Sequence, residues 1–323
     1  MYGCEYAMSV IAIARILLPA GLEPLQERAE VRAGGPDATP DRVREIAAGA
    51  DVLVADPSVS VDAELLDVAG PGMRLVANFA VGYDNVDIEE CRRRGVAVTN
   101  TPDVLTNATA ELALTLSLAA ARFLSEAERD LRAGRWHGWD PAAYRGLELS
   151  GTTVGVVGLG RIGGRYAELL AGFGVELLYT ARSPKPEVEA RLGATRVELD
   201  ELLRLSDVVS LHVPASPETH HLIDADALRL MGERAVLVNT ARGSLVDLVA
   251  VAAALREGRL GAVGLDVYED EPRVPAEILE APRAVLAPHI GSATVRARDA
   301  MARTVADNVI AFLDGREPPN RVA

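Results

Sequence analysis

Short apolar runs alternate with helical patterns along most of the chain. Between residues 10 and 100 these runs include Asp51–Ala55, Leu75–Ala77 and Val96–Val98. From Thr152 onward the rhythm continues in six runs: Thr153–Val157, Glu176–Thr180, Asp207–Val213, Ala235–Asn239, Gly261–Asp266 and Ala284–Pro288. Short strands that alternate with helices are typical of parallel sheets. The pattern predicts an α/β protein with two doubly wound parallel-sheet domains, one flavodoxin-like and one Rossmann, and a cleft between them.

Two helical segments lie outside this alternation. Thr109–Arg129 is an Ala- and Leu-rich pattern that predicts one long connecting or interface helix. Because this helix is too apolar to stand alone, we expect it near the interface of a homodimer. Ser292–Asp314 is also helical and has no strand partner of its own, so we expect it to pack back on the N-terminal domain.

Size and charge disfavour several classes of protein. A chain of 323 residues exceeds what one hydrophobic core usually organises, which again predicts two domains. The formal net charge of −14 disfavours binding to nucleic acid or to an anionic membrane surface. Val10–Ala14 is apolar, but Arg15 follows it directly, so this stretch fits neither a signal sequence nor a membrane span. Met8 is an alternative start of the chain.

The cysteine content favours a reducing compartment. Cys4 and Cys91 are the only cysteines in the sequence. Two cysteines are too few for a disulfide framework or for a cysteine metal site. We therefore expect a cytoplasmic protein without a metal centre.

A glycine-rich loop predicts a dinucleotide site. The strand pattern Thr153–Val157 runs directly into Gly158, Gly160 and Gly163, and a helical pattern over Gly164–Phe173 follows. In this context the first glycine permits a tight turn, the second lets a pyrophosphate approach the backbone, and the third allows close helix packing. The phosphates would lie at a helix N-terminus, whose N–H groups favour anions.

The residues at the end of the second strand of this domain indicate which nicotinamide cofactor, NADH or NADPH, is used. An enzyme that uses NAD usually has a carboxylate there for the ribose 2′-hydroxyl. Here Ala181, Arg182 and Ser183 follow the strand instead. Without a carboxylate there is no charge repulsion of a 2′-phosphate, and an arginine and a hydroxyl can donate hydrogen bonds to it. NADPH is therefore favoured over NADH. The alternative is that Arg182 is a solvated loop residue and that either cofactor is used.

Reduction with such a cofactor also needs a proton donor near neutral pH. His289 follows the run Ala284–Pro288, at the carboxyl edge of the sheet, where doubly wound folds bind their ligands. It is the best candidate among the five histidines. His212 in a strand and His220 and His221 at a helix start are interpreted as structural. His137, between two tryptophans, is a weak candidate for a substrate contact.

The same sheet edge carries a cation and several carboxylates. Arg242 directly follows a strand, where its guanidinium can make paired hydrogen bonds to a carboxylate and a keto oxygen. A carboxylate beside His289 would fix the ring and favour its protonated form. Asp266 lies at this edge, and three acidic residues follow in the loop beyond it: Glu269, Asp270 and Glu271. Their positions do not show which of them would meet His289. The alternative is that all three belong to a solvated acidic loop.

These motifs resemble the D-isomer-specific 2-hydroxyacid dehydrogenase family, most closely its glyoxylate and hydroxypyruvate reductase branch. The resemblance extends from about Arg15 to Asn320. Its most specific segments are Asn78–Asp87, Thr99–Thr106, the Gly158 loop, Asn239–Gly243, Gly264–Tyr268 and Pro288–Ala293. It implies hydride transfer to a small 2-keto acid, giving the D-2-hydroxy acid.

The resemblance also implies roles for individual residues. His289 would be the proton donor, with Glu271 as its partner and Arg242 as the substrate cation. The backbone N–H groups of Val81 and Gly82 would bind the substrate carboxylate, and Trp139 of a neighbouring subunit would reach the substrate pocket. The nucleotide contacts would be Gly158, Leu159, Gly160, Arg161, Ile162, Gly163, Ala181, Arg182, Ser183, Thr240, Ala241, Asp266, His289 and Gly291.

Family domains are discontinuous, so the substrate domain would comprise residues 1–100 and 290–323, and the cofactor domain residues 101–289. Ala181 is the one departure, because many members have Asp there, which puts NAD preference in doubt.

Three related readings are less favoured. Phosphoglycerate dehydrogenases of the long type carry a regulatory domain that this sequence lacks. Formate dehydrogenases pair the histidine with Gln in place of Glu271. Nucleotide-sensing corepressors of the C-terminal-binding-protein type carry extended tails and peptide-binding surfaces that are not found here.

Overall fold

A computed structural model describes residues 8–323, which form two compact units. One unit runs up to Leu105 and includes Ser292–Ala323, and the other is Thr106–Gly291. We call them unit 1 and unit 2. Cys4 and the question of the chain start lie outside the described residues. Cys91 is a buried free thiol.

Unit 1 is a five-stranded sheet in the order β2-β1-β3-β4-β5, with every strand pair parallel. This is the flavodoxin-like order. Its strands are β1 (Val10–Ile13), β2 (Glu30–Ala33), β3 (Val52–Ala55), β4 (Leu75–Asn78) and β5 (Ala97–Thr99). Its helices are α1 (Pro19–Gln26), α2 (Pro40–Ala47), α3 (Ala63–Ala69), α4 (Ile88–Arg94) and α13 (Val295–Leu313).

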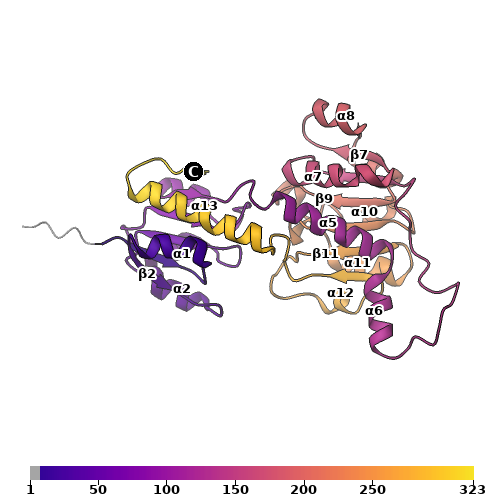
Figure 1. The fold of residues 1–323 in the computed structure, drawn as a ribbon, viewed down its shortest axis with the longest axis horizontal. Coiled ribbons are helices and arrows are strands. Elements are labelled where there is room, and N and C mark those ends of the chain that lie inside the picture. The colour runs from indigo at the N-terminus through magenta and orange to yellow at the C-terminus, as the bar shows by residue number, and fades with distance from the viewer. Residues whose placement is uncertain (1–7) are drawn as a thin grey trace, which may run out of the picture. The chain divides into compact units, whose positions relative to one another are not determined.

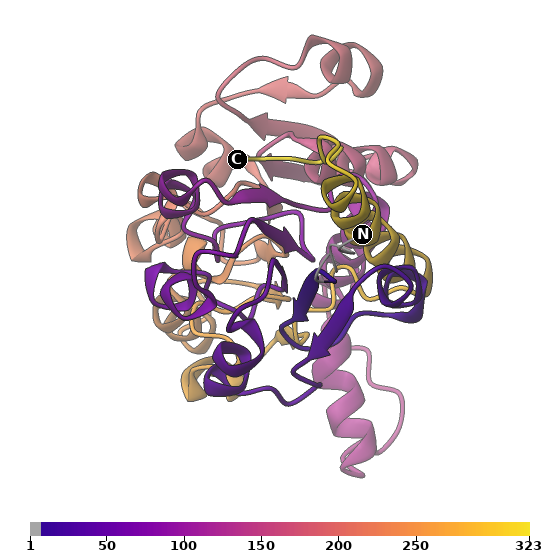
Figure 2. The same ribbon diagram turned by 90° about the vertical axis from the view of Figure 1, so that its left-hand side faces the viewer.

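Alternate strand residues of unit 1 point to opposite faces of its sheet. Ile11 and Ile13 pack with residues of α13 on one face, while Ala12 and Ala14 pack with residues of α2 and α3 on the other. The last helix, α13, lies alongside α1 (Figures 1 and 2). The expectation that the C-terminal helix packs on the N-terminal domain is therefore confirmed.

Unit 2 is a seven-stranded parallel sheet in the order β12-β11-β10-β9-β6-β7-β8. Counted along the chain from β6, this is the Rossmann order with a seventh strand added at one edge. The strands are β6 (Thr153–Val157), β7 (Glu176–Thr180), β8 (Thr195–Arg196), β9 (Val208–Leu211), β10 (Val236–Asn239), β11 (Ala262–Leu265) and β12 (Ala284–Leu286). The predicted class, α/β with two parallel-sheet domains, is confirmed.

Helices cover both faces of the unit 2 sheet. Val154 and Val156 pack under α5 and α7, whereas Val157 points to the face covered by α9, α10 and α11. The helices are α5 (Thr106–Ala121), α6 (Leu124–Arg132), α7 (Arg161–Leu170), α8 (Pro186–Leu192), α9 (Leu199–Leu205), α10 (Ala225–Leu230), α11 (Leu248–Arg256) and α12 (Ala276–Leu279), with 3-10 turns η1 (Ala171–Phe173), η2 (Pro217–Thr219) and η3 (Gly243–Leu245).

Three expectations about individual elements are wrong. The single helix expected over Thr109–Arg129 is two helices, α5 and α6, because Phe123 adopts a left-handed conformation (φ 51°) that bends the chain by 66°. The pair His220–His221 lies between η2 and α10 and not at a helix start. The sheet of unit 2 contains seven strands where six were predicted, and the one without a prediction is β8, a polar edge strand that lacks an apolar run.

Helices α5 and α6 together form an apolar stretch that can be compared in length and composition with a membrane-spanning helix. Among residues 8–323, no single helix is long and apolar enough to cross a membrane. The two helices satisfy that requirement only when they are combined across their bend. Seven residues of α5 are buried within unit 2, among them Ala113, Leu116 and Ala120.

Candidate active site

The turn that carries His289 is held by Asp266. Asp266 follows β11 and is 1% exposed. Its carboxylate accepts hydrogen bonds from the Ile290 N–H (2.6 Å) and the Gly291 N–H (2.7 Å), and its carbonyl accepts from the His289 N–H (2.9 Å). His289 itself has a left-handed φ of 54°, a conformation that needs such support. Burial raises the pKa of Asp266, while the two N–H donors oppose that shift.

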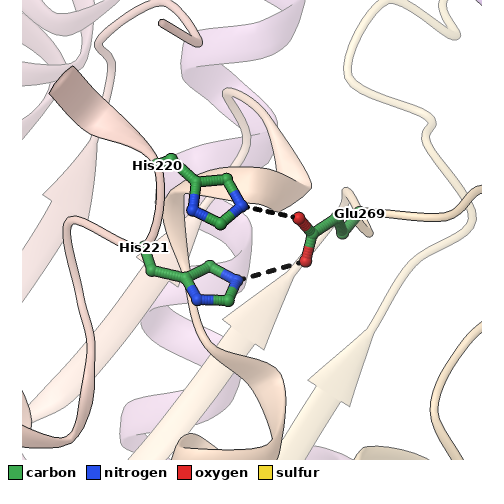
Figure 3. A group of neighbouring side chains, drawn as sticks. All are labelled: His220, His221 and Glu269. Carbon is green, nitrogen blue, oxygen red and sulfur yellow. Dashed lines mark hydrogen bonds and ion pairs between the residues drawn. The ribbon is translucent and has the colours of Figure 1, made fainter. Parts of the chain in front are cut away.

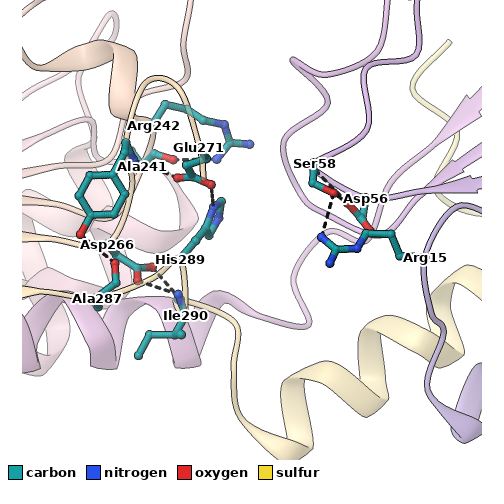
Figure 4. Close-up of polar contacts among 12 residues, drawn as sticks. Arg15, Asp56, Ser58, Ala241, Arg242, Asp266, Glu271, Ala287, His289 and Ile290 are labelled. Atoms are coloured by element: carbon teal, nitrogen blue, oxygen red, sulfur yellow. Dashed lines mark hydrogen bonds and ion pairs between the residues drawn. The ribbon is translucent and has the colours of Figure 1, made fainter. Parts of the chain in front are cut away.

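Glu271 is the acidic residue that meets His289. Its Oε2 lies 2.6 Å from His289 Nδ1 (Figure 4). Its Oε1 accepts the Tyr268 N–H at 3.0 Å. Burial would raise the pKa of Glu271, but the hydrogen bonds from His289 and Tyr268 outweigh it, aided by the charges of His289 and Arg242, and hold the pKa below its usual range. Glu271 is therefore ionised at neutral pH. Both side chains keep about a third of their surface exposed, 36% for His289 and 33% for Glu271, so a small molecule can reach them.

Arg242 lies in a turn directly after β10, braced by Asn239. The Asn239 side chain donates to the Arg242 carbonyl (2.8 Å) and accepts the Ala241 N–H (3.0 Å). The next residue, Gly243, touches the backbone of the loop that carries Glu271, since a Cβ there would fall 1.9 Å from the Tyr268 carbonyl carbon. This close approach places the arginine turn against the Glu271 loop, which only glycine permits. Figure 4 draws Arg242, Glu271, His289 and Asp266 together in unit 2.

The glycine loop has the geometry that a pyrophosphate requires. Gly158 has φ 94°, and a Cβ on Gly163 would fall 2.1 Å from the Gly158 carbonyl oxygen, so both positions require glycine. A Cβ on Gly160 would meet nothing within 4 Å, which leaves open space beside the loop. Gly160 is also the N-cap of α7 and offers no side-chain cap, and a helix N-terminus of this kind favours an anion.

Other observations in unit 2 also fit a dinucleotide. The loop follows β6, which neighbours β9 at the point where the strand order reverses, and doubly wound folds bind ligands there. Thr240 is buried, yet its hydroxyl has no hydrogen-bond partner among the described residues. A buried hydroxyl of this kind is usually satisfied, so it fits a polar group of a ligand.

The segment after β7 is positively charged. Ala181 is half-buried, and Arg182 and Ser183 are exposed. Arg196, on the adjacent strand β8, donates to the Ala181 carbonyl from Nε (3.2 Å) and Nη2 (2.9 Å). Two arginines therefore lie where an NAD enzyme has its ribose-binding carboxylate.

Comparisons with known proteins identify the family. The family model described as D-isomer specific 2-hydroxyacid dehydrogenase, NAD binding domain, matches residues 114–291. The glyoxylate reductase of Thermococcus onnurineus is 50% identical over 286 residues, which cover 87% of this chain and 84% of the relative. The chain belongs to the D-isomer-specific 2-hydroxyacid dehydrogenases. It is an oxidoreductase with a nicotinamide-binding domain.

Further relatives of this dehydrogenase match over nearly its full length. The glyoxylate reductase of Thermococcus kodakarensis is 47% identical and covers 97% of this chain and 95% of the relative. A solved protein of Thermus thermophilus superposes with a TM-score of 0.91 at 43% identity, covering 97% of this chain and all (100%) of that one. An NADPH-dependent glyoxylate/hydroxypyruvate reductase of Sinorhizobium meliloti, solved with NADP and malonate, has a TM-score of 0.86 at 37% identity, covering 98% and 97%.

Within unit 1, the turn after β4 has occupied carbonyls. The Val81 and Gly82 carbonyls accept hydrogen bonds from the side chains of Asn100 and Asn78, each at 2.8 Å. Within the part of the chain that the structure describes, neither the Val81 nor the Gly82 N–H donates a hydrogen bond. A turn whose carbonyls are occupied while its N–H groups are not is suited to an anion. Arg15, after β1 of the same unit, donates to the Pro36 carbonyl (3.0 Å). It also donates to the Ser58 hydroxyl at 3.4 Å (Figure 4).

The other histidines of this dehydrogenase are placed differently. Loss of water around the ring lowers the pKa of His212 to about 3, so His212 is neutral at physiological pH and cannot serve as the proton donor. His220 and His221 both contact Glu269, far along the chain. His137 and Trp139 lie in an exposed segment, and Trp139 is 86% exposed.

Sequence reasoning did not find two residues that shape the site. Asn239 fixes the Arg242 turn, and its signal is an amide at the end of an apolar strand. Arg196 lies on β8, which has no apolar pattern, so no sequence signal linked it to Ala181.

Proposed function

We propose that this dehydrogenase reduces a small 2-keto acid, glyoxylate or hydroxypyruvate, to the D-2-hydroxy acid, with NADPH preferred over NADH and His289 as the proton donor. The observation that carries the proposal is the 2.6 Å contact between His289 Nδ1 and Glu271 Oε2. It occupies one ring nitrogen and leaves Nε2 for a substrate oxygen. The low cysteine content favours the cytoplasm as the compartment.

The residues that would hold the cofactor all come from unit 2. The loop Gly158–Gly163, with Leu159, Arg161 and Ile162, would bind the pyrophosphate, and Ala181–Ser183 the ribose end. The nicotinamide end would lie near Thr240, Ala241, Asp266, His289 and Gly291. When bound, the reduced nicotinamide supplies a hydride.

The chain's own residues would perform the rest of the reaction. As the carbonyl carbon accepts the hydride, the carbonyl electron pair moves to oxygen, and His289 Nε2 donates its proton there. His289 is left neutral, and Glu271 keeps the ring oriented throughout. The carboxylate of Glu271 favours the protonated imidazole before the transfer because it is ionised.

Arg242 would hold the substrate and polarise it. A guanidinium can donate paired hydrogen bonds to a carboxylate oxygen and to the keto oxygen, on which negative charge develops. The N–H groups of Val81 and Gly82 are further proposed contacts of the substrate carboxylate.

A substrate panel with both cofactors tests this proposal. We expect the full-length protein to oxidise NADPH fastest with glyoxylate or hydroxypyruvate, and NADH more slowly. Oxidation of neither cofactor by any keto acid would refute the proposal, and binding without turnover would favour a corepressor-like role. A preference for 3-phosphohydroxypyruvate would instead indicate a phosphoglycerate dehydrogenase.

Replacing the 2′-phosphate site should change the cofactor preference. Ala181→Asp combined with Arg182→Ala should shift the ratio of kcat/KM for NADPH and NADH toward NADH by about 1–3 kcal/mol, the usual contribution of charge-assisted hydrogen bonds. Steady-state kinetics with each cofactor measures the shift. Arg204→Ala, a surface arginine on α9 paired with Asp200, is the control and should leave the ratio unchanged. An unchanged NADPH efficiency in the double variant would contradict the assignment.

Removing the partner of His289 should move the pH profile. Glu271 is ionised at neutral pH because its pKa is lowered, so Glu271→Gln removes a negative charge from beside the imidazole. The protonated ring then loses stabilisation, and the fall of reductase activity with rising pH should begin at lower pH. Asp270→Asn, the exposed neighbouring acid, should give the wild-type profile. If both profiles overlay that of the wild type, Glu271 does not have this role.

We also propose a homodimer that forms through α6 and the segment after it. Both views show this part extending beyond the sheet of unit 2 (Figures 1 and 2), and α6 has no buried residue. Large apolar side chains of α6 and of the segment after it are unusually exposed: Leu124 58%, Leu131 58%, Trp136 58% and Trp139 86%. A second copy would cover them, with Trp139 reaching the neighbouring substrate site. Light scattering at micromolar concentration should give twice 34.2 kDa, and a monomer would contradict the proposal.

A further inference from the structure

A second group of ionisable side chains lies in unit 2 beside the candidate active site. The rings of His220 and His221 stack with centroids 4.1 Å apart and an angle of 21° between them. His220 Nε2 lies 2.9 Å from Glu269 Oε1, and His221 Nε2 lies 3.2 Å from Glu269 Oε2 (Figure 3). Two imidazole nitrogens and a carboxylate thus lie close together, with one ligand atom from each residue all within 4.8 Å of one another.

These three groups have the chemistry of a transition-metal site. Zn²⁺ is bound by His nitrogen and carboxylate oxygen at about 2.0–2.2 Å, usually in tetrahedral geometry. Two ligands of one tetrahedral zinc are therefore about 3.3 Å apart. The observed nitrogen–oxygen separations of 2.9 and 3.2 Å are already close to that spacing. We propose that His220, His221 and Glu269 bind one Zn²⁺ ion in place of the direct contacts that they make with one another.

The backbone prepares this arrangement before any ion binds. His221 has a left-handed φ of 47°, and its N–H donates to the Ser244 carbonyl at 2.7 Å. Ser244 follows Gly243, which packs directly on the backbone of Tyr268 and Glu269. The histidine pair and the glutamate therefore lie on two adjoining segments. The close packing of Gly243 on the backbone of Tyr268 and Glu269 sets the distance between these segments.

The site is separate from the Glu271–His289 pair but joined to it through the backbone. Glu269 uses both carboxylate oxygens on the two histidines, and Glu271 uses both of its own on Tyr268 and His289. A metal on Glu269 would clamp the segment that carries Glu271 to the segment of His220 and His221, which bonds to Ser244 beside the Arg242 turn. We therefore expect the ion to stabilise unit 2 against unfolding.

The exposure of the ligands indicates how the ion would be held. The side chains of His220, His221 and Glu269 are 53%, 35% and 41% exposed. Three protein ligands at such a surface leave the fourth tetrahedral position to water, so the ion exchanges with solvent. Binding should also weaken in acid, because the imidazoles must be neutral to act as ligands.

Titration of metal-free, full-length protein with ZnCl2 in a calorimeter tests the proposal. We expect one equivalent to bind, and affinity to fall at least about tenfold in each of His220→Ala, His221→Asn and Glu269→Gln. Asn is chosen at position 221 because it tolerates a positive φ, and Gln preserves the shape of Glu269. His137→Ala, an exposed histidine outside the group, and His289→Ala should both bind as the wild type does.

A second measurement guards against variants that fail to fold. Excess ZnCl2 should raise the Tm of the wild type by about 5 °C and leave that of Glu269→Gln unchanged, while the metal-free forms melt alike. The proposal is overturned if the wild type binds no stoichiometric Zn²⁺, or if the three variants bind it with wild-type affinity. Loss of binding in His289→Ala alone would also overturn it, because the ion would then belong to the candidate active site. None of these results depends on the proposed reductase activity.

Discussion

His289→Ala is expected to lower kcat for glyoxylate reduction about a hundredfold or more, the usual contribution of a positioned general acid. The imidazole is the titratable group that Glu271 and the Asp266-braced turn hold in place. Alanine removes the donor but keeps the Cβ, so the turn should persist. The defect should appear in kcat more than in KM, because proton donation occurs in the transition state.

Cofactor binding gives the control for this variant. Because His289 is only one of many proposed nucleotide contacts and the glycine loop does not involve it, NADPH should bind to His289→Ala with an affinity near that of the wild type, measured by fluorescence titration. Near wild-type turnover on glyoxylate and hydroxypyruvate from about pH 5 to 9 would mean that another group or water donates the proton.

Arg242→Ala is expected to raise KM for glyoxylate and also to lower kcat, reducing kcat/KM by about a hundredfold or more. The guanidinium would contact the substrate carboxylate in the ground state and the keto oxygen as charge develops on it. Loss of the first contact raises KM, and loss of the second lowers kcat. Steady-state kinetics separates the two effects.

Arg242→Lys is the matched control for the arginine. Lysine keeps the charge but lacks the planar pair of donors, so the activity of this variant should lie between those of alanine and wild type. Equal activity of all three proteins would contradict a substrate role for Arg242. An effect on KM alone would remove only its role in the transition state.

The sequence predicts most strands of this fold because buried parallel strands are continuous apolar runs. Thr153–Val157 and Glu176–Thr180 match β6 and β7 residue for residue. The edge strand β2 has the polar sequence Glu30–Ala33 and is only partly buried, so it carries no such signal. The break between α5 and α6 was also unpredictable, because Phe123 adopts its left-handed conformation without a nearby glycine or proline.

The candidate site was predictable to the extent that strand ends define it. Arg242, Asp266 and His289 each follow a strand, and the carboxyl ends of parallel strands meet at one edge. Position along the chain could not decide which acid pairs with His289. The loop after β11 turns Glu269 toward His220 and His221 and Glu271 toward His289, an outcome set by its conformation. The resemblance, and not the residue pattern, favoured Glu271.

The transfer of a labelled hydride tests the central proposal most directly. Full-length protein would be given hydroxypyruvate and NADPH that carries deuterium at the reactive C4 position, with either stereochemical label prepared separately. We predict that one of the two labels appears at C2 of the product and that the product is D-glycerate. Glycerate without deuterium from either label, L-glycerate, or no glycerate at all would contradict the account.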